Sequence, residues 1–206
     1  PAAPFAFVSA YDADSEGVEG KYYVWTANEI DTLLGGHAPV FKQAYDVAPG
    51  GNWEGHTILN RSADADFGDP NREAVLEECR RILLAHRSTR IPPMRDDKVL
   101  ADWNGMTIAA LAKAAPVFDQ PEWLETAADV FAFVVDNLSD GARLHHTWCA
   151  GRAAHPGVLE DYANLARAAL ALHQATGDDT YLARAKSLVE VLDRHFWDDA
   201  HGGYFM

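Results

Sequence analysis

Acidic and aromatic side chains stand close together at several points in this 206-residue chain. Carbohydrate sites need that pairing, because carboxylates bond sugar hydroxyls and aromatic faces cover the C–H face of a ring. The first example is the stretch DADSEGVEGKYYVW, in which Asp12, Asp14 and Glu16 precede Trp25. One interpretation is a polar turn whose carboxylates accept backbone N–H bonds. The other makes Asp12, Asp14 and Trp25 sugar ligands and Glu16 a catalytic acid or base.

A calcium loop is a third interpretation of this stretch, which its later residues exclude. Such a loop takes oxygens from its first, third and fifth positions and has glycine at the sixth, where Gly17 stands. It also needs a bidentate glutamate at its twelfth position, with a helix after it. That position is Tyr23, and residues 21–25 (KYYVW) have the composition of a strand. We therefore expect no calcium here.

Asp102 and Asp161 recur at equivalent points, each in the first turn of a predicted helix. A carboxylate there is favoured by free N–H groups and by the helix dipole, so capping explains both residues. In a barrel of helical hairpins, however, the ends of the inner helices surround a central funnel. The two aspartates are therefore also candidates for a general acid and a general base. The candidate sugar ligands beside them are Trp103, Asn104, Glu160 and Tyr162.

A second pairing of aromatic and acid occurs in GNWEG, where Trp53 and Glu54 lie between two glycines. Glycines permit close approach of the backbone to a ligand, although they also build ordinary turns. Both interpretations remain open, and we count Trp53 and Glu54 among the candidate sugar ligands.

The adjacent residues His145 and His146 invite a metal site with Cys149, but strand geometry opposes it. Neighbours on a strand point to opposite faces, and His145 to Cys149 spans about 13 Å at ~3.3 Å per residue. One interpretation is a histidine on the surface of a hairpin. In the other, His146 points into the funnel as a proton-transfer base, because imidazole suits sugar epimerisation at neutral pH. We expect no metal and no cofactor. Motifs of serine hydrolases, P-loop proteins, zinc proteases and dinucleotide-binding proteins are missing from the sequence.

Residues 1–68 predict a loop-rich entry to the helices that must position these groups. Thr26 to Glu29 is a capping box that opens a short helix, and Gly35 ends it. Residues 49–61 predict a glycine-rich loop that enters a short strand. A long helix then begins at Asp69–Pro70 and continues to about Arg87, because proline is tolerated at the first helical position.

From residue 100 onward the chain repeats itself. Residues 100–138 align with residues 159–196 at a period of 58 to 59 residues, and each copy predicts two antiparallel helices. The first helix is small or apolar nearly all round, whereas the second has one apolar stripe and acidic residues away from it. Such pairs of inner and outer helices close into an (α/α) barrel. Alternating residues around 144–148, with glycines on both sides, predict a β-hairpin between them.

The predicted fold class is therefore mostly α. We expect a partial (α/α) six-hairpin barrel, or toroid, with short β-hairpins between the helical hairpins. The chain would form a single domain over residues 1–206, with the helical hairpins at residues 69–138 and 158–196.

Five blocks of the sequence resemble one known family. They are DADSEGVEGKYYVWT, GNWEGHTILN, DDKVLADWNGMTIAALAKA, LEDYANLARAALALHQATGD and FWDDAHGGYF, in that order. The chain resembles the family of bacterial YyaL and spermatogenesis-associated protein 20. Members of that family look like a thioredoxin-like domain followed by a six-hairpin, glycosidase-type barrel, similar to the barrels of N-acylglucosamine 2-epimerases and cellobiose 2-epimerases. The resemblance implies that this chain is the first part of the barrel. Two positions depart from the pattern: Asp102 stands where Ser is more usual, and Glu160 where Asp is common.

The composition excludes several kinds of partner. The chain has 31 acidic and 17 basic residues, a formal charge of −14, which repels nucleic-acid backbones and anionic membrane surfaces. No apolar run approaches the roughly 20 residues that a membrane span needs. Two cysteines without a ligand-like pattern suit a reducing cytoplasm, where we expect the protein to be.

Two functions remain open from the sequence. One is a carbohydrate-active domain, either an epimerase or isomerase or a hydrolase, with a sugar as its ligand. The other is a non-catalytic module that interacts with the thioredoxin-like domain of a full-length parent. Both chain ends look cut, so we expect a fragment of the ring that is inactive by itself. Its exposed inner helices would favour dimerisation.

Overall fold

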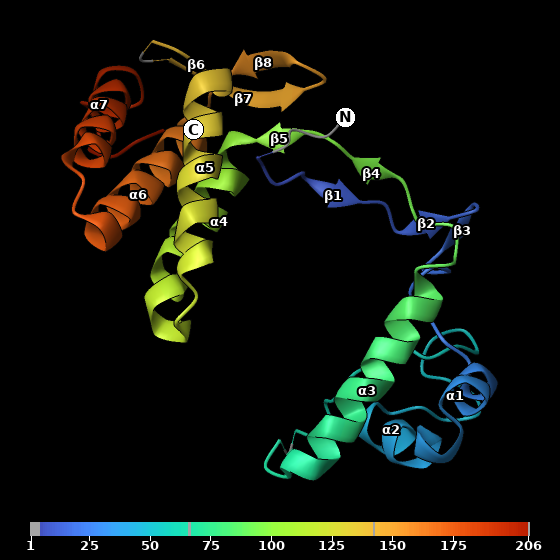
Figure 1. Ribbon diagram of the computed structural model, residues 1–206. Helices are drawn as coiled ribbons and strands as arrows, with labels where there is room; N and C mark the ends of the chain where they lie inside the picture. Colours follow the sequence, from blue (N-terminus) through green and yellow to red (C-terminus); the bar gives the residue numbers. More distant parts are fainter. Residues whose placement is uncertain (1–4, 66, 142, 206) are drawn as a thin grey trace. The chain divides into compact units, whose positions relative to one another are not determined.

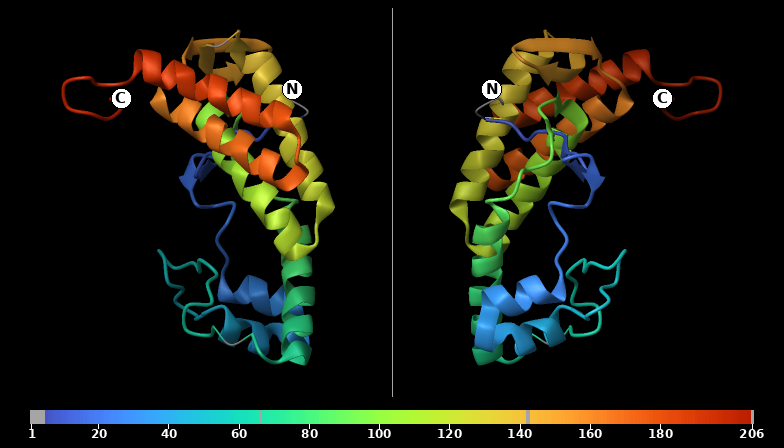
Figure 2. Two further views of the ribbon diagram at one scale, coloured as in Figure 1. Left: turned by 90° about the vertical axis from the view of Figure 1, so that its left-hand side faces the viewer. Right: turned by 90° about the vertical axis from the view of Figure 1, so that its right-hand side faces the viewer.

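The computed structural model describes residues 5–65, 67–141 and 143–205 (Figure 1, Figure 2). These residues group into two compact units. The hairpin unit combines the residues up to Ala10 with those from Arg95 onward, and the small unit is Tyr11–Met94. The short strands β1 (Ala10–Tyr11) and β4 (Arg95–Asp96) lie where the chain passes between them. Each unit has its own apolar core, so each is described by itself.

The small unit packs two short helices against one long helix. Its elements are β2 (Asp14–Ser15), β3 (Val18–Glu19), α1 (Ala27–Leu34), a 3-10 helix (Gly35–His37), α2 (Ala38–Ala44) and α3 (Pro70–Arg87). The predicted capping box is confirmed: Glu29 N–H donates to Thr26 Oγ1 at 3.2 Å, and Thr26 N–H donates to the Glu29 carboxylate at 2.8 Å. The predicted start of α3 is also confirmed, with Asp69 as its N-cap.

The predicted strand over residues 21–25 is wrong. The N–H groups of Tyr23 and Val24 both donate to Gly20 O, at 2.8 and 3.1 Å, and so close a turn. Of these residues only Trp25 pairs with another segment, through an isolated β-bridge to Thr57. The strand predicted after the glycine-rich loop is likewise replaced by two isolated bridges, Trp25 with Thr57 and Trp53 with His56. The local turn satisfies these backbone groups, so no ladder forms despite the aromatic composition.

The hairpin unit contains two antiparallel helical hairpins, as the repeat predicted (Figure 1). Its helices are α4 (Ala101–Phe118), α5 (Pro121–Leu138), α6 (Leu159–Thr176) and α7 (Asp179–His195). The inner helices α4 and α6 lie side by side, and α5 and α7 pack against their respective partners. Gly105 allows the backbones of α4 and α6 to approach closely, because a Cβ at this position would lie only 2.8 Å from the carbonyl carbon of Asn164. The mostly helical fold class, with short strands between helical hairpins, is confirmed.

A small antiparallel sheet joins the two helical hairpins. Its strands are β5 (Val99–Leu100), β6 (Ser139–Asp140), β7 (Arg143–Cys149) and β8 (Arg152–Pro156). Strand β7 is central, with β8, β5 and β6 as its partners. The turn between β7 and β8 has Ala150 at φ 50° and Gly151 at φ 83°, two left-handed residues that match the twist of a tight hairpin. The predicted β-hairpin is thus confirmed.

Helix α3 belongs to the small unit, although the sequence grouped residues 69–138 as one helical segment. Its buried residues Leu76, Cys79 and Leu83 share a core with α1 and α2. None of the helices within the described ranges has the length and hydropathy that a membrane span requires.

Candidate functional site

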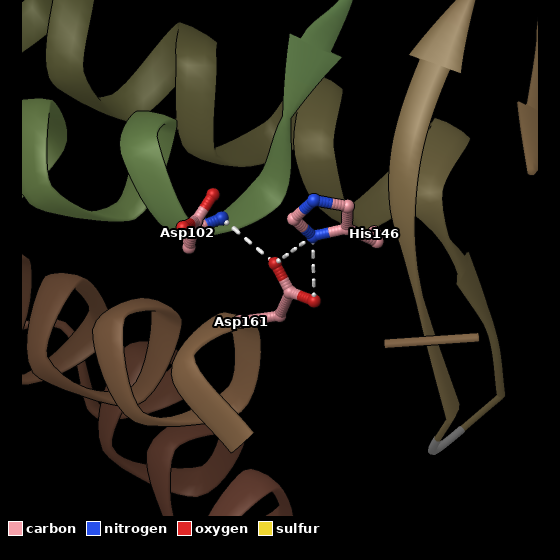
Figure 3. A group of neighbouring side chains, drawn as sticks. All are labelled: Asp102, His146 and Asp161. Atoms are coloured by element: carbon pink, nitrogen blue, oxygen red, sulfur yellow. Dashed lines mark hydrogen bonds and ion pairs between the residues drawn. The ribbon is translucent and has the colours of Figure 1, made fainter. Parts of the chain in front are cut away.

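Three of the predicted catalytic residues come together at the N-terminal ends of the inner helices (Figure 3). Asp102 comes from α4, Asp161 from α6 and His146 from β7. The β7–β8 hairpin places His146 over the start of α6, where its Nδ1 lies 3.0 and 3.1 Å from the two carboxylate oxygens of Asp161. The sequence named these residues separately, and the fold brings them within hydrogen-bonding distance.

Asp161 is the buried centre of this cluster, with 0% of its surface exposed. Its Oδ1 accepts the Asp102 N–H at 3.0 Å, and its Oδ2 accepts the Val158 N–H at 2.8 Å. With the two contacts to His146, both oxygens of the carboxylate are fully engaged. Asp161 therefore joins the ends of two inner helices and the β-hairpin, and it has no capacity left for a substrate.

His146 is held so that one ring nitrogen remains available. Because its neighbour at Nδ1 is a carboxylate, the ring carries a proton on Nδ1 and donates it to Asp161. In the neutral ring Nε2 is then an acceptor. The side chain is 32% exposed, so this nitrogen can meet a ligand, whereas Asp161 cannot. A base oriented by a buried carboxylate is the arrangement that general-base catalysis uses.

The pKa of Asp161 is raised above its ordinary value, because burial removes water from the charged carboxylate. The Val158 N–H and His146 oppose this shift by stabilising the ionised form, and the nearby Asp102 adds to it. Burial is the largest of these effects, so the folded chain holds a proton on Asp161 more tightly than the unfolded chain does.

This raised pKa predicts a pH dependence of stability. Between the ordinary and the raised pKa of Asp161, the folded state binds more protons than the unfolded state. The free energy of unfolding that depends on Asp161 therefore falls as the pH rises through this window. Urea unfolding at a series of pH values, compared between the wild type and Asp161→Asn, isolates the effect because other carboxylates cancel in the difference. A difference that does not change with pH would contradict it.

Asp102 is only half-buried and lies in the first turn of α4, whose N-cap residue is Leu100. Its Oδ1 accepts the N–H of the next residue, Trp103, at 2.8 Å. It has no bond to His146, so the predicted pair of catalytic carboxylates is asymmetric: Asp161 is buried and engaged, and Asp102 faces outward. Trp103 is 46% exposed.

The same three side chains offer ligand atoms that all lie within 4.8 Å of one another, a spacing that a metal ion could use. An ion held through His146 Nδ1 and the Asp161 carboxylate would displace the proton on Nδ1 and compete with the contacts of Asp161 to two backbone N–H groups. The existing hydrogen bonds already satisfy every buried group of the cluster, so they favour the His–Asp pair over a metal centre.

Two of the predicted sugar ligands beside this cluster have structural roles. The Asn104 amide accepts the Phe7 N–H at 2.9 Å and donates to the carbonyls of Phe7 and Leu100, at 3.0 and 2.9 Å. The Tyr162 hydroxyl accepts the Leu144 N–H at 2.9 Å. Both side chains are 1% exposed, so neither reaches a ligand. Glu160 is half-buried in the first turn of α6.

The remaining candidates lie in the small unit, where Glu16, Trp53 and Glu54 line a cavity of about 530 Å³. The two loops that carry them meet because Trp53 packs on Gly20, whose missing Cβ would lie 2.8 Å from the indole. Glu16 is paired with Lys21 at 2.7 Å. The sequence thus identified residues from two distant blocks that one cavity brings together.

Other residues of the DADSEGVEGKYYVW stretch do not line this cavity. The Asp12 carboxylate accepts the N–H of Asp14 at 3.2 Å. This bond agrees with the interpretation of the stretch as a polar turn. Trp25 is 2% exposed and belongs to the core, with the guanidinium of Arg90 4.1 Å from its ring centroid. Arg90 also lines the cavity and donates to the carbonyls of Tyr22 and Val24. Sequence reasoning missed Arg90 and Tyr22, since no motif marks a lone arginine in a loop.

The sequence was compared with family models and with known proteins. No family model matches the chain. It is 28% identical over 242 residues to human spermatogenesis-associated protein 20, which covers 97% of this chain and 31% of that protein. An uncharacterised protein of Caenorhabditis elegans is 27% identical over 239 residues, covering 97% of this chain and 32% of that protein. The chain thus spans about a third of the length of the curated relatives it matches. These matches confirm the resemblance that the five blocks indicated.

Similar solved structures include two sugar epimerases and a mannanase. The sugar epimerase from a ruminal bacterium has a TM-score of 0.49 at 16% identity, over 95% of this chain and 48% of its own. The cellobiose 2-epimerase from Spirochaeta thermophila has a TM-score of 0.46 at 21% identity, over 52% of this chain and 28% of its own. The GH76 α-mannanase from Bacteroides thetaiotaomicron has a TM-score of 0.48 at 13% identity, over 94% of this chain and 54% of its own.

Proposed function

We propose that the hairpin unit carries a sugar-transforming site of the epimerase or isomerase type, in which His146 transfers a proton. The observation that carries the proposal is the hydrogen bond from His146 Nδ1 to the buried Asp161 carboxylate, at 3.0 and 3.1 Å. It leaves Nε2 available at a partly exposed position, at the N-terminal ends of the inner helices.

The chemistry that fits this geometry is proton abstraction next to a sugar carbonyl. His146 Nε2 would take the proton from the carbon, the electron pair would move to the carbonyl oxygen, and an enediolate would form. Water would then give a proton to the opposite face of the carbon, the carbonyl would re-form, and His146 would release its proton to solvent, which yields the epimer. Asp161 keeps the ring in one orientation and, as a carboxylate, stabilises the imidazolium that forms.

Hydrolysis by two carboxylates fits less well. Both canonical mechanisms of glycoside cleavage need two acidic groups that touch the substrate or its attacking water. Asp161 is fully buried and bonded at both oxygens, so of the two aspartates only Asp102 can reach a substrate. Burial of one member of the pair therefore favours the single histidine over the pair of acids.

The test is deuterium exchange at carbon 2 of reducing mono- and disaccharides, followed by proton NMR in heavy water. Since the sequence predicts that the isolated chain is inactive, exchange is measured in the longer parent protein as well. We expect exchange in the parent that falls roughly 100-fold or more in His146→Gln, the usual size of a general-base contribution.

The matched control is His145→Gln, because His145 lies next to His146 on β7 and points to the other face of the strand. We expect it to retain near wild-type exchange. A parent protein that exchanges no sugar of the panel would sink the proposal, as would exchange that is equal in the two histidine variants.

The alternative function is a non-catalytic module that interacts with a thioredoxin-like domain. The observation in its favour is that Asp102 bonds to its own helix and that Asn104 and Tyr162 are buried in structural roles. The thioredoxin-like partner domain and a cytoplasmic location are both proposals that follow from the sequence.

A further inference from the structure

The repeated pair of an acid and an aromatic residue differs between the two inner helices. A shift of 59 residues places Asp102 on Asp161 and Trp103 on Tyr162. Trp103 is 46% exposed, whereas Tyr162 is 1% exposed. An indole offers only an N–H donor, but a phenol hydroxyl can also accept a hydrogen bond. The pair on α6 therefore offers a buried acceptor beside its acid, which the pair on α4 cannot do.

The Tyr162 hydroxyl uses this capacity at the start of β7. The Leu144 N–H donates to it at 2.9 Å, and the bond is buried. The Leu144 carbonyl accepts the Gly157 N–H at 2.7 Å, where the chain leaves β8. Gly157 allows this approach, because a Cβ there would lie 2.9 Å from the Cβ and the carbonyl oxygen of Leu144. Both backbone groups of Leu144 are thus engaged, one of them by a side chain of α6.

His146 follows Leu144 by two residues on β7, so the two side chains point to the same face of the strand. At that face the His146 ring meets the Asp161 carboxylate (Figure 3). Consecutive residues of α6 therefore hold alternate residues of β7, with Tyr162 on Leu144 and Asp161 on His146. Two attachments about 7 Å apart along the strand fix both its distance from α6 and its rotation about its own axis.

We propose that the Tyr162 hydroxyl keeps His146 bonded to Asp161, which makes Tyr162 a positioning residue for the proton transfer. The proposal rests on the proposed function above, and it gives Tyr162 a role other than the sugar contact expected from the sequence.

The physical reason is the burial of the Leu144 N–H. Without the hydroxyl this donor has lost its acceptor, and water reaches it only if β7 moves away from α6, because Leu144 and Tyr162 are both buried. Asp161 does not follow that movement, since the N–H groups of Asp102 and Val158 hold its carboxylate at the helix starts. The bond from His146 Nδ1 to Asp161 then lengthens.

Loss of that bond changes which nitrogen of the ring carries the proton. Nδ1 keeps the proton because Asp161 accepts it. A ring released from Asp161 exchanges between the two tautomers. In the fraction of molecules that have the proton on Nε2, this nitrogen cannot act as a base. Tyr162 thus affects the chemistry through the tautomer and orientation of His146, without touching the sugar.

Nitrogen-15 NMR of the histidine side chains in the full chain reads the tautomer directly. The His146 signals are those missing from the spectrum of His146→Gln. We expect well-separated Nδ1 and Nε2 shifts in the wild type, and shifts that approach each other in Tyr162→Phe. Gly157→Ala leaves the hydroxyl in place but presses on Leu144 from the other side, so it should change the shifts in the same direction.

The matched control is Tyr181→Phe, which removes a hydroxyl from a half-buried tyrosine whose ring packs against Phe131. It should keep the wild-type histidine shifts, and circular dichroism checks that all variants stay folded. In the longer parent protein, Tyr162→Phe should lower kcat for exchange at carbon 2 about tenfold and leave KM unchanged, because no sugar contact is lost.

The two readouts separate this inference from the proposed function. His146 shifts that are the same in Tyr162→Phe as in the wild type overturn the inference, even where the parent protein exchanges sugar. Shifts that change equally in Tyr181→Phe overturn it as well. A parent protein without sugar exchange overturns the proposed function, whereas the dependence of the tautomer on Tyr162 is measured without any sugar.

Discussion

Replacing Asp161 with alanine is expected to lower the free energy of unfolding by about 2–5 kcal/mol. The substitution leaves the N–H groups of Val158 and Asp102 without their acceptor, and each buried unsatisfied donor costs roughly 1–3 kcal/mol. It also removes the partner of His146 Nδ1. Some of this loss is offset because a desolvated charge disappears. Urea unfolding followed by circular dichroism measures the change.

Two further variants define how this loss arises. Asp161→Asn keeps the volume and one acceptor oxygen, but turns an NH₂ group toward one N–H donor, so we expect an intermediate loss of about 1–3 kcal/mol. Asp102→Asn leaves the Asp102 N–H bond to Asp161 in place and changes only a half-buried carboxylate. We expect it to cost less than about 1 kcal/mol. If Asp161→Ala were no more destabilising than Asp102→Asn, the cluster would not join the helices as described.

Gly105→Ala is the second substitution with a large expected effect, and its sign is diagnostic. In an ordinary helix interior this change stabilises by up to about 1 kcal/mol, because alanine has the higher helix propensity. Here the new Cβ would lie 2.8 Å from the carbonyl carbon of Asn164 and 3.0 Å from the Leu165 nitrogen, so α4 and α6 must separate. We expect a net destabilisation of about 1–3 kcal/mol, which grows further in Gly105→Val.

The control for this prediction is Ala110→Gly, on the exposed side of the same helix. It changes helix propensity without changing the contact between α4 and α6, so it should cost about 1 kcal/mol. The thermal unfolding midpoints of the three variants give the comparison. A Gly105→Ala variant that is more stable than the wild type would show that the inner helices do not depend on this close approach.

Local signals in the sequence predicted most of the helical structure correctly. The capping box at Thr26, the proline start after Asp69 and the repeat after residue 100 each depend on contacts within a few residues or on periodicity. The strand over residues 21–25 failed for a related reason. Its aromatic composition favours a strand, but pairing requires a partner, and the turn onto Gly20 satisfied the same backbone groups locally.

The sequence predicted which residues belong to the candidate site but not which of them contact one another. Asp102, Asp161 and His146 were chosen because helix starts and a hairpin carry them, yet nothing in the spacing shows that His146 bonds to Asp161 rather than to Asp102. Asn104 and Tyr162 were chosen as polar or aromatic neighbours of an acid. Only packing shows that both are buried and bonded to backbone groups, which removes them from a ligand.

By itself, the sequence determined that this chain is acidic, mostly helical and built from a repeated pair of inner and outer helices, because charge, periodicity and capping are local or additive properties. The tertiary structure decided how Asp161 is used. A carboxylate in the first turn of a helix can cap that helix, bind a substrate or orient a base, and its sequence is the same in each case. Close packing of α4 on α6 at Gly105 and the register of β7 bury Asp161 and bring His146 to it. The roles of Asp161 and His146 therefore depend on burial and on the distance between residues far apart in the chain. No local sequence pattern encodes either property.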